Sequence, residues 1–433
     1  MHSAIRRSLR VLVPLLLSGS FALAALPASA TNEPSTTPNA PVATCGVRNA
    51  PPPPVDTSEK PAPGKLAPAP LPVPALPVGG PRMAECGDVL PANALNPPAG
   101  TTAASWVLQD LDTGNVIAAK DPHARQRPAS LIKTLLALVV VTELKPADII
   151  VPTKEDATQE CTCVGIAEGG QYTVDQLLHG LLMHSGNDVA HAFATKLGGV
   201  DVALGKMNAL AAKIGAMDTR AATPSGLDGP GMSTSAYDLS LIFHAAMAQP
   251  EFAAAVGTKQ YQFPGWADKP AFPIYNDNKL LGVYPGFLGG KTGFTDDARH
   301  TYVGAAQRGG KRVAIVLMRG EQKPTKLIDQ ASKLLDYGFA LQADKAEPVG
   351  VLDYRPDKVD EANPPPADGS ADNAAPNEAA KQPEDPFGTT GWIITLVVSL
   401  LVIGGFVLGH QRKKAEAAVN DDDARTSPGV RRR

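Results

Sequence analysis

Between residues 103 and 339, the apolar positions follow strand-like, then helix-like, then again strand-like patterns. Two short apolar runs, Ser105–Leu108 and Val116–Ala119, flank the turn sequence Asp112-Thr113-Gly114-Asn115 and predict a β-hairpin. Longer stretches with helical spacing come next. The helices that we expect there are Ser130–Leu144, Val174–Met183, Val189–Leu197, Val202–Ile214 and Tyr237–Met247.

Strands are predicted again towards the end of this region. Lys291–Phe294 opens one strand, and Thr301–Ala306 and Val313–Met318 form a hairpin across Gly309-Gly310. The last amphipathic stretch, Leu327–Phe339, predicts a helix that ends the domain.

Strands at both ends with helices between them predict a single domain over residues 99–344. Its class is α/β (α+β), with a mainly antiparallel sheet covered by helices and a helical subdomain beside it. About 245 residues are enough to bury a substantial core.

The composition on either side of this domain does not support a packed core. Residues 31–98 hold 18 of the 41 prolines, which favours an extended chain that spaces the domain or wraps on its surface. A proline-rich ligand for a partner domain is the alternative. Residues 345–390 are rich in Pro, Asp, Asn and Ala, and predict a disordered stalk.

The N-terminal segment indicates export. Residues 1–30 combine three arginines and an apolar run with the small residues Ala28-Ser29-Ala30, as a secretory signal peptide does. A short membrane anchor is the alternative.

The C-terminal segment indicates attachment to a membrane. Residues 391–409 are apolar and uncharged, and are long enough to cross a bilayer as one helix. Arg412, Lys413 and Lys414 follow, which predicts that residues 410–433 form a cytoplasmic tail. A buried core helix is the alternative. We therefore expect a single-pass membrane protein with the domain of residues 99–344 on the secreted side.

Charge and cysteine content narrow the function classes. The net charge is −3, so the chain has no general attraction to nucleic acid. The four cysteines form an even set in an oxidising compartment, where thiols pair. We favour Cys45 with Cys86, clamping the proline-rich segment, and a second bridge of Cys161 with Cys163. A metal site at the second pair lacks further ligands.

The first string whose side chains could take part in a reaction is Ser130-Leu131-Ile132-Lys133. Ser130 and Lys133 lie three residues apart at a helix start, so their side chains share one face. A serine hydroxyl needs a neighbouring base to become a nucleophile, and lysine is that base only when its pKa is lowered. Burial and the charge of Lys291 would lower it, leaving Lys133 neutral and Lys291 charged. The alternative is a helix cap beside a solvated lysine.

Two further strings complete the set. Ser185-Gly186-Asn187 offers a hydroxyl to shuttle a proton and a carboxamide to hold a substrate amide, unless it is an ordinary turn. Lys291-Thr292-Gly293 offers a grip for a carboxylate, with a phosphate loop or a plain turn as the alternatives. The backbone N–H groups of Ser130 and Phe294 are the candidates for an oxyanion hole. His184 has no suitably placed acidic partner, so we interpret it as structural.

The order S-x-x-K, S-x-N, K-T-G resembles the motif set of penicillin-binding proteins and β-lactamases. The chain is similar to serine D-alanyl-D-alanine carboxypeptidases of the peptidase S11 type, low-molecular-mass penicillin-binding proteins, especially actinobacterial ones. The resemblance covers roughly residues 103–339. The strings that carry it include Arg127-Pro128-Ala129-Ser130, His184-Ser185-Gly186-Asn187-Asp188, Thr223-Pro224-Ser225-Gly226-Leu227 and Gly290-Lys291-Thr292-Gly293-Phe294-Thr295.

This resemblance implies a DD-peptidase/β-lactamase-like fold and an acyl-enzyme reaction on the peptidoglycan stem pentapeptide. Ser130 would attack the bond between the last two D-alanines and Lys133 would take its proton. Ser185 and Asn187 would assist, while Lys291 and Thr292, with Gly293, would bind the terminal carboxylate. β-Lactam antibiotics would acylate Ser130, and neither a metal nor an organic cofactor is implied.

Several alternatives remain at this point. A β-lactamase would share the three motifs, although class A enzymes usually have S-D-N as the middle one. A DD-endopeptidase or transpeptidase would use the same residues, and a non-enzymatic wall-binding module would explain the linkers without S-x-x-K. Many relatives carry a second, all-β domain, and the short distance to residue 391 argues against one here.

Overall fold

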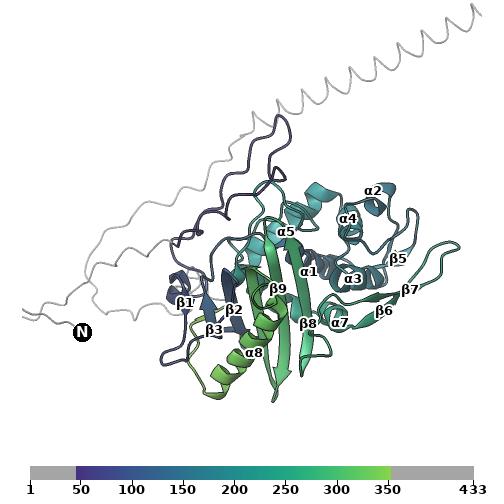
Figure 1. Cartoon of the computed structure of the whole chain (residues 1–433). Helices are drawn as coiled ribbons and strands as arrows, with labels where there is room; N and C mark the ends of the chain where they lie inside the picture. The colour runs from purple at the N-terminus through teal and green to yellow at the C-terminus, as the bar shows by residue number, and fades with distance from the viewer. Residues whose placement is uncertain (1–44, 353–433) are drawn as a thin grey trace, which may run out of the picture. The chain divides into compact units, whose positions relative to one another are not determined.

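The hairpins predicted at the two ends of the domain lie side by side in one sheet. The computed structural model describes residues 45–352 (Figure 1). In it, β2 (Ser105–Asp110) and β3 (Asn115–Lys120) form the first hairpin. β9 (Arg299–Arg308) and β10 (Lys311–Gly320) form the second, and β10 pairs with β2. The start and the end of the domain therefore close on each other.

The remaining strands extend this sheet at both sides. β8 (Phe287–Thr295) pairs with β9 and forms one edge, while β1 (Asp88–Val89) and β11 (Gly350–Val351) pair with β3 at the other. The order is β1-β3-β2-β10-β9-β8, and all of these pairs are antiparallel. Two separate ribbons join β4 (Ile149–Ile150) to β5 (Tyr172–Thr173) and β6 (Gln260–Phe263) to β7 (Phe272–Tyr275).

Alternating side chains of the sheet face two different cores. Val107 and Val316 belong to the larger core, which the central helices share, whereas Leu108 and Ile315 belong to a second core under α8 (Leu327–Ala343). This alternation follows from the two-residue repeat of a strand. The prediction of an antiparallel sheet covered by helices is confirmed.

The larger core is built around α1 (Lys133–Glu143), whose residues are buried from Lys133 to Val140. A helix that is apolar on all sides is expected at the centre of a domain. The helices around it are α2 (Lys154–Ala157), α3 (Val174–Met183), α4 (Asn187–Lys196), α5 (Val200–Ile214), α6 (Ala236–Met247) and α7 (Pro250–Gly257).

The predicted helix at Ser130 differs from the structure at its start. Residues Ala129–Ile132 form a 3-10 turn, and the α-helix begins at Lys133. Ala129 has φ +48°, which an α-helix does not accommodate, so the regular helix starts only after the serine. The short elements β1, β4, β5, β6, β7, β11, α2 and α7, and a second 3-10 turn at Pro81–Ala84, were not predicted.

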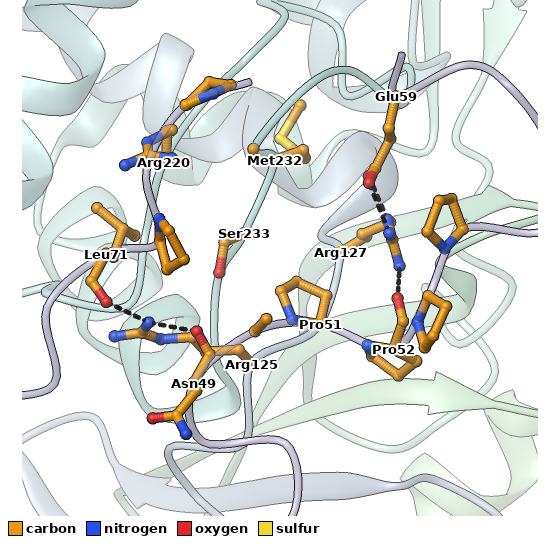
Figure 2. Close-up of a pocket in the computed structure, with 16 residues that line it drawn as sticks. Asn49, Pro51, Pro52, Glu59, Leu71, Arg125, Arg127, Arg220, Met232 and Ser233 are labelled. Atoms are coloured by element: carbon orange, nitrogen blue, oxygen red, sulfur yellow. Dashed lines mark hydrogen bonds and ion pairs between the residues drawn. The ribbon is translucent and has the colours of Figure 1, made fainter. Parts of the chain in front are cut away.

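The described part of the proline-rich segment, residues 45–98, wraps along the domain that follows it, and we call it the N-terminal strap. A disulfide joins Cys45 to Cys86. The buried guanidinium of Arg125 donates hydrogen bonds to the carbonyl oxygens of Asn49 and Leu71 (Figure 2). Polyproline-like chain has no internal hydrogen bonds, so its carbonyls are free to accept from a side chain of the domain.

Several predicted segments lie outside the described residues: the signal peptide 1–30, the start of the proline-rich segment, most of the stalk, the membrane helix 391–409 and the tail 410–433. Within residues 45–352, no single helix is long and apolar enough to cross a membrane. Only α6 and α7 taken together, bent by 103°, pass that test.

Candidate active site

The turn that carries Ser130 is shaped by close contacts from two glycines. Gly226 has φ +87°, and a Cβ at this position would lie 2.0 Å from the carbonyl oxygen of Ala129. A Cβ on Gly293 would lie 3.0 Å from the backbone nitrogen of Ser130. Only glycine lets both backbones approach this closely. The serine therefore sits between the 223–227 loop and the edge strand β8.

Lys133 lies directly beneath this serine. Its ammonium nitrogen is 3.1 Å from Ser130 Oγ, and it donates to Asn187 Oδ1 at 2.8 Å and to the Ser225 carbonyl oxygen at 2.6 Å. The side chain is completely buried. Burial lowers the pKa of Lys133 well below its ordinary value, the charge of Lys291 lowers it further, and the carboxylate of Asp188 opposes the shift.

Burial and the charge of Lys291 favour the neutral amine, and the contacts of Lys133 can accommodate that form. An uncharged lysine has two N–H bonds and one lone pair. The two N–H bonds are used by Asn187 Oδ1 and the Ser225 carbonyl, so the lone pair is left to face the hydroxyl of Ser130. The arrangement can therefore remove the proton of the serine hydroxyl.

The second motif lies between α3 and α4. Ser185 is buried and has φ +61°, a left-handed conformation that costs a non-glycine residue about 1–2 kcal/mol. A Cβ on Gly186 would lie 2.7 Å from Asp188 Oδ1 and 2.9 Å from Val164 Cγ2, so a side chain between Ser185 and Asn187 has no room. His184 is the C-cap residue of α3.

The third motif lies on the edge strand β8. Lys291 is buried and donates to the carbonyl oxygen of Thr292 at 2.8 Å. Burial lowers the pKa of Lys291 to about 8, and the charge of Asp277 opposes that shift. At neutral pH this lysine therefore keeps its positive charge, which is one of the two causes that lower the pKa of Lys133.

Phe294 follows the third motif at an exposed position. Its side chain is 48% exposed, and its ring lies 4.5 Å from that of His300, centroid to centroid. Its backbone belongs to β8, the strand that approaches the Ser130 nitrogen through Gly293. The oxyanion hole between the N–H groups of Ser130 and Phe294 stays a prediction, and these contacts place the two backbones on neighbouring segments.

The structure thus brings Ser130, Lys133 and Asn187 into direct contact and places Lys291, Gly293 and Phe294 on the adjoining strand. It also adds two contributors that the motifs did not indicate, the Ser225 carbonyl and the carboxylate of Asp188. Both lie in strings that carried the resemblance, so the sequence signal was present without a role attached to it.

The pocket drawn in Figure 2 is a different site. It lies between the N-terminal strap and the catalytic domain and is lined by Arg125 and Arg127, among others, and by none of the three motifs. Arg127 lies just before the turn Ala129–Ile132, which carries Ser130, and pairs with Glu59 of the strap. The strap therefore supports the turn from outside.

Metal-ligating side chains also gather away from the motifs. Among residues 45–352, three groups of His, Cys, Asp or Glu lie close enough to share an ion, and none contains a motif residue. In one of them, Cys45 and Cys86 are already bonded to each other.

Comparison with known proteins adds independent information. The family model described as peptidase S11, D-alanyl-D-alanine carboxypeptidase, matches residues 92–322, more than half of the chain. The D-alanyl-D-alanine carboxypeptidase DacB2 of Mycobacterium tuberculosis is 49% identical over 259 residues, which cover 59% of this chain and 88% of that protein. DacF of Bacillus subtilis is 30% identical over 55% of this chain and 62% of its own length.

Solved structures agree with this. The crystal structure of a D-alanyl-D-alanine carboxypeptidase from M. tuberculosis matches with a TM-score of 0.58 and 48% identity, over 60% of this chain and 99% of that one. A variant of the Streptomyces K15 DD-transpeptidase matches with a TM-score of 0.53 and 28% identity, over 56% of this chain and 100% of that one.

Proposed function

Since the chain belongs to the peptidase S11 family of D-alanyl-D-alanine carboxypeptidases, we propose that Ser130 is the nucleophile that trims the terminal D-alanine from peptidoglycan stem pentapeptides. The observation that carries this role is the set of oxygens around Lys133 Nζ: Asn187 Oδ1, the Ser225 carbonyl oxygen and, at 3.1 Å, Ser130 Oγ. In the neutral amine, the form that burial and the charge of Lys291 favour, the first two accept its N–H bonds and the lone pair faces Ser130 Oγ. The enzyme is a serine-type peptide hydrolase of this family.

Acylation follows from these contacts. Ser130 Oγ attacks the carbonyl carbon of the penultimate D-alanine while Lys133 accepts the hydroxyl proton. The tetrahedral oxyanion is stabilised by the backbone N–H groups of Ser130 and Phe294. The C–N bond then breaks, and the proton passes to the leaving amine with the help of Ser185. Free D-alanine departs and an ester on Ser130 remains.

The carboxylate of the substrate is held at the opposite end. Lys291 and the hydroxyl of Thr292 bind it, and a charge-assisted hydrogen bond of this kind contributes about 1.5–3 kcal/mol. The free side of β8 lets the stem peptide add as a further antiparallel strand, because β8 is an edge of the sheet. The peptide bond then lies over Ser130.

Water completes the cycle by hydrolysing the ester. With a penicillin the same attack opens the β-lactam ring, and the leaving nitrogen stays tethered to the acyl group. The adduct on Ser130 is therefore long-lived, as covalent penicillin binding is typical of the family.

A β-lactamase with the same three motifs is less favoured by one observation. The position that is Asp in the class A motif is Gly186 here, and a side chain at this position would collide with Asp188 and Val164. A transpeptidase or endopeptidase differs only in the acceptor or the leaving group. The structural similarity to a DD-transpeptidase makes transpeptidation the second candidate activity.

We also propose the cellular setting. The apolar segment 391–409 anchors the chain in the membrane, and the catalytic domain faces the peptidoglycan on the outer side. Deleting residues 391–433 should move the labelled protein from the membrane to the soluble fraction without loss of labelling. Membrane retention of that truncated chain would contradict the proposal.

Labelling with a fluorescent penicillin tests the enzymatic role. The full chain should incorporate one label per molecule and release D-alanine from a pentapeptide, whereas Ser130→Ala should do neither. Lys133→Met should fold but label on the order of 10²–10⁴ times more slowly, the usual contribution of a general base. Rapid β-lactam turnover would favour the β-lactamase instead, and labelling that survives Ser130→Ala would refute the assignment.

A further inference from the structure

The bridge between Cys161 and Cys163 lies in a loop that touches the second motif, and the reaction above gives it no role. The two cysteines are bonded to each other and enclose a single residue, Thr162. Cys161 is exposed and Cys163 is half-buried, so the bridge is accessible from solvent. We define residues 160–166 as the disulfide loop.

Two backbone carbonyls of this loop bind Asn187. The Glu160 carbonyl accepts from Asn187 Nδ2 at 2.7 Å, and the Thr162 carbonyl accepts from the backbone nitrogen of Asn187 at 2.7 Å. These two carbonyls flank Cys161, one of the bridged cysteines. The bridge therefore fixes the part of the chain that holds the asparagine.

Asp188 secures the other end of the loop. Its carboxylate accepts from the backbone nitrogens of Val164, Gly165 and Ile166 at 2.7–3.1 Å. Asp188 is completely buried and directly follows Asn187. The loop is thus attached to the second motif on both sides of the bridge.

The contact with Glu160 sets the orientation of the Asn187 carboxamide. A carbonyl only accepts hydrogen bonds, so the NH₂ end must face Glu160 and the oxygen must face Lys133. In the flipped orientation the NH₂ group would donate to the lone pair of Lys133. That lone pair would then no longer be available for the proton of Ser130.

We infer that the Cys161–Cys163 bridge is a positioning element of the active site, which keeps Asn187 in the orientation that leaves Lys133 free to act as a base. The inference rests on the role proposed above for Ser130 and Lys133. It makes the rate of acylation dependent on the oxidised state of one solvent-accessible bridge.

Reduction is the direct test. One dithiothreitol reduces the bridge to two thiols and becomes a cyclic disulfide, so two electrons and two protons pass to Cys161 and Cys163. We expect the rate of penicillin acylation by the full chain to fall on the order of 10- to 100-fold, since a displacement of about 1 Å costs a catalytic group roughly 10²-fold. The final labelling stoichiometry should stay at one.

Two double variants identify the bridge responsible, because dithiothreitol also reduces Cys45–Cys86. Cys161→Ala/Cys163→Ala should label slowly with or without the reductant. Cys45→Ala/Cys86→Ala keeps the bridge of the disulfide loop, so the ratio of its rates with and without dithiothreitol should equal that of the wild type. The ratio is informative whatever the basal rate of either variant.

The outcomes separate the explanations. A lower stoichiometry at an unchanged rate would mean partial unfolding and would overturn the inference. So would a wild-type rate that ignores dithiothreitol, or a response that persists in Cys161→Ala/Cys163→Ala. Failure of the untreated wild type to label at all would instead refute the proposed function.

Discussion

Raising the pH should weaken recognition of the carboxylate before it affects the nucleophile. Lys291 is completely buried, and burial lowers its pKa to about 8. Burial lowers the pKa of Lys133 well below its ordinary value, and the charge of Lys291 lowers it further. The active form proposed above carries a neutral Lys133 and a charged Lys291, so its alkaline limit is the titration of Lys291.

The size of the effect follows from these values. At pH 9 about one tenth of the molecules retain the charge on Lys291, so kcat/KM should fall about tenfold from its maximum. The decline should level off once the charge-assisted hydrogen bond is lost, at about 10- to 150-fold for a bond of 1.5–3 kcal/mol. Because kcat/KM reports the free enzyme, its alkaline limb should lie near pH 8. In the complex the bound carboxylate raises the pKa of Lys291, so kcat should decline at a higher pH.

The assay is the second-order rate constant of penicillin acylation between pH 6 and pH 10. A penicillin with a free carboxylate is compared with its methyl ester, which has no charge for Lys291 to bind. The ester should react slowly and show no alkaline limb, and Lys291→Ala should remove the limb for the free acid. A rate for the free acid that stays level to pH 9.5, or an equal decline for the ester, would refute the reasoning.

Two further changes test the scaffold. Gly226→Ala places a Cβ 2.0 Å from the Ala129 carbonyl oxygen. Acylation of Ser130 by penicillin should therefore slow at least about 100-fold, while the final labelling stoichiometry stays at one. A wild-type rate would contradict this contact. Asp218→Asn leaves the buried His123 and Arg125 without their carboxylate, and urea unfolding at pH 7 should show a loss of about 3–5 kcal/mol. Burial raises the pKa of Asp218, but His123 and Arg125 together lower it by more, so the net shift is downward. The contribution of Asp218 is therefore present above the unfolded pKa and is lost as the pH falls through the folded one. A difference between wild type and variant that is as large at pH 3 as at pH 7 would contradict the assignment.

The sequence predicted the regular elements well where the apolar pattern was long. The range Val174–Met183 agrees at both ends, because Thr173 caps this helix and the pattern stops at His184. The start of the helix after Ser130 was misplaced by one turn, since Ala129 has a left-handed φ at a place where its backbone lies against Gly226, which is distant in sequence. The two-residue strands β4 and β5 form only through their mutual pairing and have no pattern of their own.

The site shows the same division between local and distant information. Side-chain types can be recognised in the sequence, so the motifs predicted that Ser130, Lys133 and Asn187 belong to one site. In the structure these residues are in contact. The role of the Ser225 carbonyl could not be predicted, because every residue type carries a backbone oxygen and only the fold brings this one to Lys133. The same holds for the Glu160 and Thr162 carbonyls that bind Asn187.

The different charges of the two buried lysines follow from what surrounds each of them. Lys133 donates to two neutral oxygens, and the carboxylate of the nearby Asp188 already accepts from four backbone N–H groups, three of them in the disulfide loop. Burial lowers the pKa of both lysines, but the charge of Asp277 supports the charge of Lys291, whereas the charge of Lys291 opposes that of Lys133. Two lysines can therefore serve in one site as a base and as a cationic anchor. Exchanging the charges would require Asp188 to face Lys133, which the disulfide loop prevents by occupying its oxygens.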